Sequence, residues 1–276
     1  MKDDHASDGK SDIGKKPTGL TPGPDHADEL THRGNAHNPV WGPWATLIWG
    51  VLIGVVFVAV QGAVVSVYLN AATSDQADPG VYERAITDGD ILSWATIASA
   101  VIGIILVAMA VALRRGSNFK QYLGLYPVDK IRVIKWTLLF VALLILLDLT
   151  TSYLDRPVTP DVMREIYSSA DSKLLLFIGV VVAASVFEEL FFRGFLMEGF
   201  RQTFLGPWGS VLVTAVFWSV VHIQYDLYGV ATIFIIGLFL GLAKIKSGST
   251  LFAMALHVLN NGIAFFFLAL MSRMDV

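Results

Sequence analysis

Long apolar segments alternate with short polar ones from about residue 44 to near the end of the sequence. Each segment is close to the ~20 residues that an α-helix needs to cross a hydrocarbon core about 30 Å thick. This pattern predicts an all-α fold, a polytopic membrane bundle of about seven transmembrane helices. The segments lie at about 44–69, 91–113, 134–154, 173–200, 207–225, 228–246 and 249–271.

The first 40 residues contain no apolar run and are rich in Asp, Gly, Pro, Lys and His. A segment of this composition cannot bury enough apolar surface to offset the entropy lost on ordering, so we expect a disordered tail. We therefore divide the chain into three parts. These are the tail (1–40), the first three helices with a basic loop (41–171) and a C-terminal helical core (172–272).

The composition excludes several classes of protein. Hydrophobic residues make up 54% of the 276 residues and charged residues 16%, which is too apolar for an ordinary soluble domain. The absence of cysteine excludes disulfides and a cysteine nucleophile. A formal net charge of −3 argues against a nucleic-acid partner.

The loops on either side of the second predicted helix differ in charge. The loop after it holds six Lys or Arg residues between Arg114 and Lys135, whereas the loop before it holds Arg84 among five acidic residues. Short loops rich in Lys and Arg stay on the cytoplasmic side of a membrane. This asymmetry predicts a cytoplasmic N-terminus and an external C-terminus.

Three charged residues lie close together within the fourth apolar segment: Glu188, Glu189 and Arg193. A charged side chain at the bilayer centre costs about 2.5–3.5 kcal/mol on insertion scales, so such residues are usually paired or functional. On an α-helix Glu189 and Arg193 share one face and can form an ion pair. Glu188 points about 100° away and has no such partner in its own helix. The trio is therefore either a structural brace or part of a functional site.

Two later segments carry polar side chains at helical spacing. His222 follows Trp218 by four residues, and Asn261 follows His257 by four, so each pair shares a helix face. If these faces converge on the two glutamates, they supply the base, second proton carrier and oxyanion donors of an acyl-transfer site. The alternative is hydrogen bonding between helices, which is also the role we expect for Asp148 in the third helix.

The order of these motifs resembles a known family. Glu-Glu-x-x-x-Arg at 188–193, then a segment with His222, then His257-x-x-x-Asn261 is similar to the CPBP family of intramembrane endopeptidases. That family includes the type II CAAX prenyl endopeptidases and the bacteriocin self-immunity proteins. The resemblance covers about residues 172–271.

The resemblance implies an intramembrane endopeptidase of a bacterial inner membrane, acting on a membrane-embedded or lipidated protein. It implies that Glu188 with His222 activates a water molecule, while His257 and Asn261 stabilise the oxyanion. The family usually has Phe where this chain has Trp218. The positions that would shape the site are Glu189, Arg193 and Trp218.

Two alternatives remain open at this point. Glu188, His222 and His257 could bind zinc as three ligands with an open water position. The sequence has no His-Glu-x-x-His motif, so we favour metal-free glutamate chemistry without a cofactor. The non-enzyme alternative is a membrane scaffold or immunity protein that retains the motif for packing.

Overall fold

A computed structural model describes residues 39–72, 85 and 87–274 of the chain. The predicted tail over 1–40 lies outside the described residues, apart from its last two positions. Within the described part, six helices are long and apolar enough to cross a membrane, judged by length and composition. They are α2 (Pro43–Ala72), α4 (Gly89–Leu113), α6 (Lys130–Tyr153), a composite helix (Lys173–Arg201), α12 (Leu227–Ser247) and α13 (Thr250–Met274).

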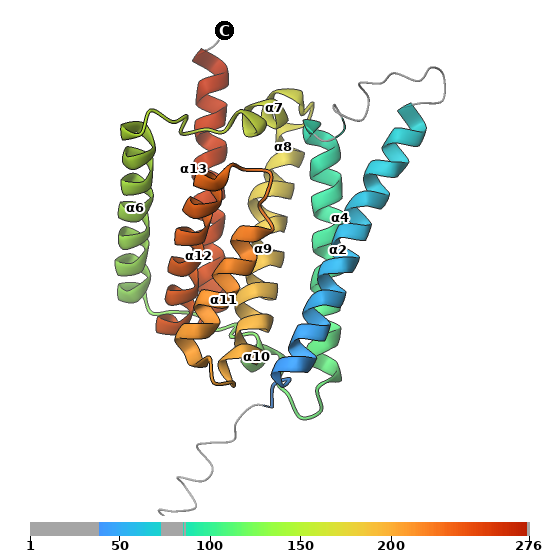
Figure 1. Cartoon of the computed structure of the whole chain (residues 1–276), viewed down its shortest axis with the longest axis vertical. Helices are drawn as coiled ribbons and strands as arrows, with labels where there is room; N and C mark the ends of the chain where they lie inside the picture. Colours follow the sequence, from blue (N-terminus) through green and yellow to red (C-terminus); the bar gives the residue numbers. More distant parts are fainter. Residues whose placement is uncertain (1–38, 73–84, 86, 275–276) are drawn as a thin grey trace, which may run out of the picture. The chain divides into compact units, whose positions relative to one another are not determined.

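A seventh apolar helix, α11 (Gly206–Val220), is shorter. Its 15 residues extend about 22 Å at about 1.5 Å per residue, less than the thickness of the hydrocarbon core. The helices run alongside one another (Figure 1). The prediction of an all-α membrane bundle of about seven helices is confirmed, but the end of the fifth helix, predicted at residue 225, was wrong.

The chain leaves α11 early because it turns back toward α12. The His222 N–H donates to the Ser219 carbonyl and the Tyr225 N–H to the His222 carbonyl, which closes two successive turns. Asp226 then accepts a hydrogen bond from the Gly229 N–H and starts α12. The Gly229 N–H and the Arg156 guanidinium hold the pKa of Asp226 below its usual value.

The composite helix is the most buried of the six membrane-length helices. The predicted membrane span at about 173–200 is confirmed, and two π-helical segments interrupt its α-helix. Such segments are rare and occur frequently at functional sites. In order, the composite helix consists of α8 (Lys173–Leu176), η1 (Phe177–Ala183), α9 (Ala184–Glu188), η2 (Glu189–Leu196) and α10 (Met197–Arg201).

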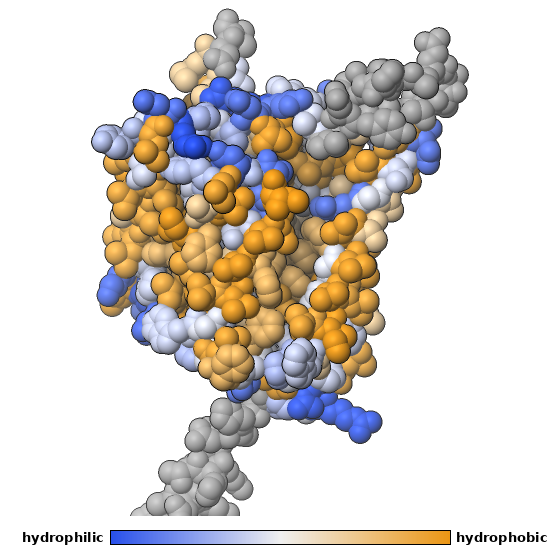
Figure 2. All heavy atoms as spheres, in the orientation of Figure 1, coloured by the Kyte–Doolittle hydropathy of each residue, from blue (hydrophilic) through white to orange (hydrophobic). Residues whose placement is uncertain are grey.

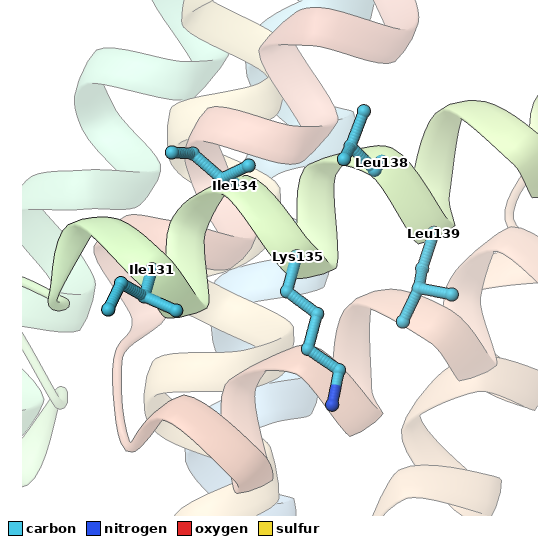
Figure 3. Close-up of a pocket in the computed structure, with 5 residues that line it drawn as sticks. All are labelled: Ile131, Ile134, Lys135, Leu138 and Leu139. Atoms are coloured by element: carbon cyan, nitrogen blue, oxygen red, sulfur yellow. The ribbon is translucent and has the colours of Figure 1, made fainter.

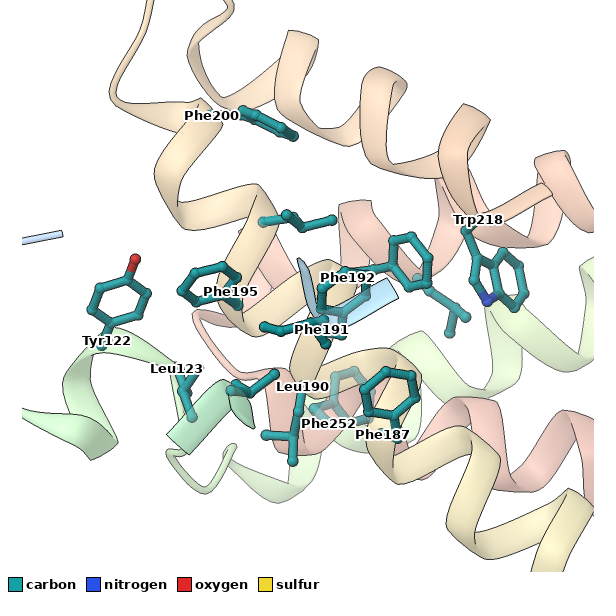
Figure 4. Close-up of a cluster of buried hydrophobic side chains, with 14 of the residues drawn as sticks. Tyr122, Leu123, Phe187, Leu190, Phe191, Phe192, Phe195, Phe200, Trp218 and Phe252 are labelled. Atoms are coloured by element: carbon teal, nitrogen blue, oxygen red, sulfur yellow. The ribbon is translucent and has the colours of Figure 1, made fainter. Parts of the chain in front are cut away.

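Aromatic side chains of the composite helix fill the centre of the bundle. Phe187, Phe191, Phe192 and Phe195 are buried there (Figure 4). The Phe187 ring stacks on that of Phe57 in α2, with centroids 4.6 Å apart. Because lipid is as apolar as these rings, close packing rather than removal from water joins the helices.

Two short helices lie between the long ones. α5 (Phe119–Tyr122) exposes Phe119 and buries Tyr122, and burial raises the pKa of the Tyr122 phenol to about 12. α7 (Asp161–Ser169) packs Ile166 and Tyr167 into an apolar cluster with Leu268 of α13. Figure 1 shows α7 beside the start of α8, at the end of the bundle opposite α10.

The outer surface has the distribution expected of a membrane protein. Hydrophobic residues cover the middle of the face in Figure 2, and hydrophilic residues gather toward its two ends. Asp148 of α6 is exposed and has no hydrogen-bond partner in another helix among the described residues. Our expectation of an interhelical hydrogen bond was therefore wrong, because α6 buries a different face, which carries Phe140 and Thr151.

Glycines allow close helix contacts at several positions of the bundle. A Cβ atom on Gly237 would lie 2.9 Å from Trp218 Cε3, and one on Gly241 would lie 2.9 Å from Val211 Cγ1. The expected close approach of Gly237-x-x-x-Gly241 to a neighbour is thus confirmed, and the neighbour is α11. At Gly199 of α10 the added Cβ would lie 2.0 Å from Thr46 Oγ1 of α2.

We predict that Gly199→Ala lowers the free energy of unfolding by about 1–3 kcal/mol, because the methyl group overpacks the contact with Thr46. Gly54→Ala in α2 is the matched control. Nothing lies within 4 Å of a Cβ there, so this variant should gain up to about 1 kcal/mol from helix propensity. Thermal unfolding of both proteins in detergent makes the comparison. A Gly199→Ala protein as stable as the wild type would contradict the contact.

Candidate active site

Glu188 and Glu189 lie where the composite helix changes type. Glu188 is the last residue of α9 and Glu189 the first of η2. Neighbouring residues of a helix point about 100° apart, so the two carboxylates meet different neighbours. The Glu189 side chain is fully buried, whereas 19% of the Glu188 side chain is exposed.

Glu189 is the centre of a buried charge cluster. Its Oε1 accepts hydrogen bonds from Arg193 Nη1 at 2.8 Å and from His257 Nδ1 at 3.0 Å. Arg193 Nη2 donates to the Gly237 carbonyl at 3.2 Å, and the guanidinium lies over the Trp218 ring, 4.7 Å from its centroid. The predicted ion pair of Glu189 and Arg193 is confirmed. Its neighbours come from α11, α12 and α13.

Glu188 faces α11 and α13. Its Oε2 accepts a hydrogen bond from Trp218 Nε1 at 2.5 Å and lies 3.9 Å from His257 Nε2. The second distance is longer than a hydrogen bond. His257 therefore lies between the two carboxylates. Because a carboxylate accepts, His257 Nδ1 carries the hydrogen that bonds Glu189, and Nε2 is directed toward Glu188.

His222 joins the site through Trp218. Its Nδ1 donates to the Trp218 carbonyl at 2.7 Å, and the two rings meet edge to face with centroids 5.2 Å apart. In a neutral imidazole this leaves His222 Nε2 as the acceptor nitrogen. We expected His222 inside the fifth helix, but it lies in the turn after α11. In the described residues no direct hydrogen bond joins it to Glu188.

Asn261 contacts the composite helix at a different level from His257. Its Nδ2 donates to the Val180 carbonyl at 3.1 Å and to Ser185 Oγ at 3.2 Å. Its Oδ1 accepts from Asn260 Nδ2 at 3.0 Å. His257 and Asn261 thus both face the composite helix, as their spacing predicts, but Asn261 binds η1 and α9 rather than the two glutamates.

The sequence did not indicate that Tyr225 and Gly237 belong to the site. Tyr225 stacks on His222 with ring centroids 6.3 Å apart, and burial together with the charge of Glu188 raises its pKa to about 12. Its phenol is therefore a protonated donor at neutral pH. The Gly237 carbonyl accepts from Arg193, whereas the sequence indicated only close packing at this glycine. A polar ring three residues after His222 was the available signal for Tyr225.

The zinc alternative would use Glu188, His222 and His257 as its three ligands. The described residues contain no group of three or more His, Cys, Asp or Glu side chains that could hold a metal ion. Trp218 contacts two of these residues, since its N–H donates to Glu188 and its carbonyl accepts from His222. A three-ligand zinc site needs all three donor atoms within about 2.0–2.2 Å of one point.

A hollow on α6 is separate from this site. It has a volume of about 530 Å³ and is lined by Ile131, Ile134, Lys135, Leu138 and Leu139 (Figure 3). All five residues belong to one helix at the edge of the bundle, and none belongs to the candidate site. Hydrocarbon chains of lipid would cover such a surface.

We predict that Glu189→Ala and Arg193→Ala each lower the free energy of unfolding by about 3–5 kcal/mol, because each leaves a buried charge without its partner. The double variant should lose less than the sum of the two singles. The exposed pair Asp129 and Arg132, at 3.3 Å, is the control and should contribute about 0–1 kcal/mol. The free energy of unfolding of each variant in detergent gives a double-mutant cycle for each pair. Additive losses at Glu189 and Arg193 would mean that the pair is no brace.

Comparison with known proteins supports a family for this part of the chain. Residues 170–263 match the family model described as "Type II CAAX prenyl endopeptidase Rce1-like". An "Uncharacterized 24.3 kDa protein" of Escherichia coli is 31% identical over 87 residues, which cover 31% of this chain and 40% of that protein. No solved structure matches the chain. The region that carries the site therefore matches the Rce1-like type II CAAX prenyl endopeptidase family, as the resemblance in the sequence predicted.

Proposed function

We propose that this integral membrane protein is an intramembrane endopeptidase that hydrolyses a peptide bond of a membrane-embedded or lipidated protein. The observation that carries the proposal is the setting of Glu188. Its carboxylate is partly exposed at the centre of a membrane span, anchored on one oxygen by Trp218 and 3.9 Å from His257. The family match of residues 170–263 supports a protease role.

In the proposed reaction Glu188, assisted by His222, accepts a proton from a water molecule. The water oxygen attacks the carbonyl carbon of the substrate, and His257 and Asn261 donate hydrogen bonds to the resulting oxyanion. The C–N bond then breaks and the proton passes to the leaving amine. The products are a new carboxylate and a new amine, so one water molecule is consumed for each bond cleaved.

The two glutamates have different roles in this proposal. Glu189 Oε1 accepts two hydrogen bonds, and its Oε2 is fully buried, so neither oxygen is exposed to a water molecule. Glu188 has one donor, Trp218, and retains exposed surface. We therefore assign the base to Glu188, and to Glu189 the task of holding Arg193 and the His257 ring.

The proposed chemistry uses no metal and no other cofactor. Proton transfer by Glu188 and hydrogen bonds to the oxyanion supply the catalysis of a water attack without a Lewis acid. A chelator of divalent cations should then leave proteolysis unchanged, whereas a zinc enzyme would lose activity and regain it with added zinc.

The proposed location is a bacterial inner membrane with the N-terminus in the cytoplasm. The support is the charge of the loop between α4 and α6, which carries exposed Arg115, Lys120 and Lys130. A cysteine introduced at Lys120 should be protected from an impermeant thiol reagent in intact cells. Labelling of that cysteine from outside would reverse the orientation.

A membrane scaffold or immunity protein is the second candidate function. Asn261 is the observation that favours it, because both hydrogen-bond contacts of its Nδ2 are to Val180 and Ser185 of the composite helix. An oxyanion donor would have to exchange one of these partners for the substrate. In a scaffold the same contacts would simply join α13 to the composite helix.

We predict that Glu188→Gln abolishes proteolysis while the fold stays intact. The amide keeps the shape of the side chain but cannot accept the water's proton, and loss of a general base costs about 10²–10⁴ in rate. Cleavage of a membrane-peptide library in liposomes, read by mass spectrometry, is the assay. Asp148→Asn, which changes an exposed carboxylate in α6, is the control and should retain full activity. Normal turnover by well-folded Glu188→Gln would refute the mechanism.

We predict that Asn261→Ala lowers kcat by about 10²–10³ with little change in KM, as expected for a lost oxyanion donor. Asn261→Asp should be worse, because a carboxylate repels the developing negative charge. Ser185→Ala is the matched control, since it removes one partner of Asn261 but leaves its amide in place. If Asn261→Asp is as active as wild type, or if Ser185→Ala and Asn261→Ala have equal effects on kcat, Asn261 serves only packing.

A further inference from the structure

Trp218 touches the acidic, basic and imidazole groups of the candidate site. Its indole is buried beside the aromatic cluster (Figure 4). The indole N–H donates to Glu188 Oε2 at 2.5 Å. The Arg193 guanidinium lies over the ring, 4.7 Å from the centroid. Both imidazoles, those of His222 and His257, meet the ring edge to face with centroids 5.2 Å away. One side chain thus borders four charged or titratable groups.

The indole N–H divides the two oxygens of Glu188 into different roles. In the described residues Trp218 is the donor that hydrogen-bonds this carboxylate, and Oε1 has no such partner. An indole N–H donates but cannot accept, so it competes neither for the water nor for its proton. Oε2 is therefore the anchored atom, and Oε1 is the atom left to take a proton.

The other groups around Glu188 cannot replace this anchor. Arg193 is engaged by Glu189 and by the Gly237 carbonyl. His257 Nε2 lies 3.9 Å away, beyond hydrogen-bond distance. The negative charge of Glu188 raises the pKa of Tyr225, but in the described residues no hydrogen bond joins the two side chains.

Gly237 of α12 makes the position of the indole possible. A Cβ at this residue would lie 2.9 Å from Trp218 Cε3 and 3.4 Å from Cζ3. Real Cβ atoms do not approach other atoms to 2.9 Å, so the indole would have to move. Such a movement would carry its N–H away from Glu188.

We infer that Trp218 is a positioning residue, which fixes Glu188 for proton transfer through its indole N–H, and that Gly237 reserves the space for its ring. The inference rests on the proposed function, because it concerns the base of that reaction. It adds that one glutamate oxygen is the anchor and the other the proton acceptor. It also links a residue of α12 to catalysis through packing alone.

The first test replaces Trp218 by Phe, which retains an aromatic ring and removes the N–H. Loss of a hydrogen bond to a charged group should raise the activation free energy enough to lower kcat about 10- to 100-fold. KM and the melting temperature should stay near the wild-type values. Trp208→Phe is the control, because Trp208 is exposed on α11 and contacts Lys246. Wild-type kcat in Trp218→Phe, with Glu188→Gln inactive, would overturn this inference and leave the proposed function standing.

The second test leaves Trp218 unchanged and moves its ring by a substitution at Gly237. Gly237→Ala should lower kcat, because the methyl group pushes the ring from Glu188. Added to Trp218→Phe, the same substitution should lower kcat no further, since the N–H that it would displace from Glu188 is already absent. A double variant with the kcat of Trp218→Phe alone supports the inference. Losses that multiply would overturn it.

A third measurement needs no substrate. Protein labelled with 5-fluorotryptophan gives a ¹⁹F resonance for Trp218, identified by its absence from Trp218→Phe. Glu188→Gln should shift this resonance, because it removes the charge that the N–H binds, and Asp148→Asn should not. A Trp218 resonance unchanged by Glu188→Gln would overturn the inference even if no peptide is cleaved. Full proteolysis by Glu188→Gln would instead refute the proposed function.

Discussion

A charged group inside a membrane span must find partners within the protein, and this requirement organises the centre of the molecule. Glu189 and Arg193 are both fully buried in the composite helix. Further hydrogen bonds join Glu189 to His257 of α13 and Arg193 to the Gly237 carbonyl of α12, while Trp218 of α11 covers the guanidinium. Glu189 Oε2 and Arg193 Nε are buried without a hydrogen-bond partner among the described residues. Since an unpaired charge at this depth is costly, these helices are held in one register. The candidate site is built on that register.

The position of His222 in the bundle depends on the early end of α11. A regular helix continued to residue 225 would have placed His222 about 3 Å beyond Val220 along the helix axis. Instead the chain turns, and His222 bonds the Trp218 carbonyl one turn below it. Trp218 then links His222 to Glu188 and His257, two residues inside long spans. The early end of α11 thus brings three helices to one group of polar side chains.

Much of this could be predicted from the sequence. Hydropathy located the membrane spans, and the four-residue spacing of Glu189 and Arg193 predicted their ion pair. The π-helical segments could not be predicted, because a single extra residue in a turn leaves no signature in an apolar run. The end of α11 was missed for a similar reason, since Val221 and Ile223 continue the apolar run of the helix into the turn. The bond from Trp218 to Glu188 depends on tertiary packing, which spacing within one helix does not report.

The central claim is that Glu188 activates a water molecule, and its most direct test traces the oxygen atom of that water by ¹⁸O labelling. Wild-type protein in liposomes would be given a membrane-peptide library in H₂¹⁸O, beside the Glu188→Gln variant, and stopped within one turnover. Activation of water by Glu188 predicts one ¹⁸O atom in each new C-terminal carboxylate, no acyl adduct on the protein, and no products from the variant. An acyl adduct on Glu188, or equal cleavage by the two proteins, would contradict it.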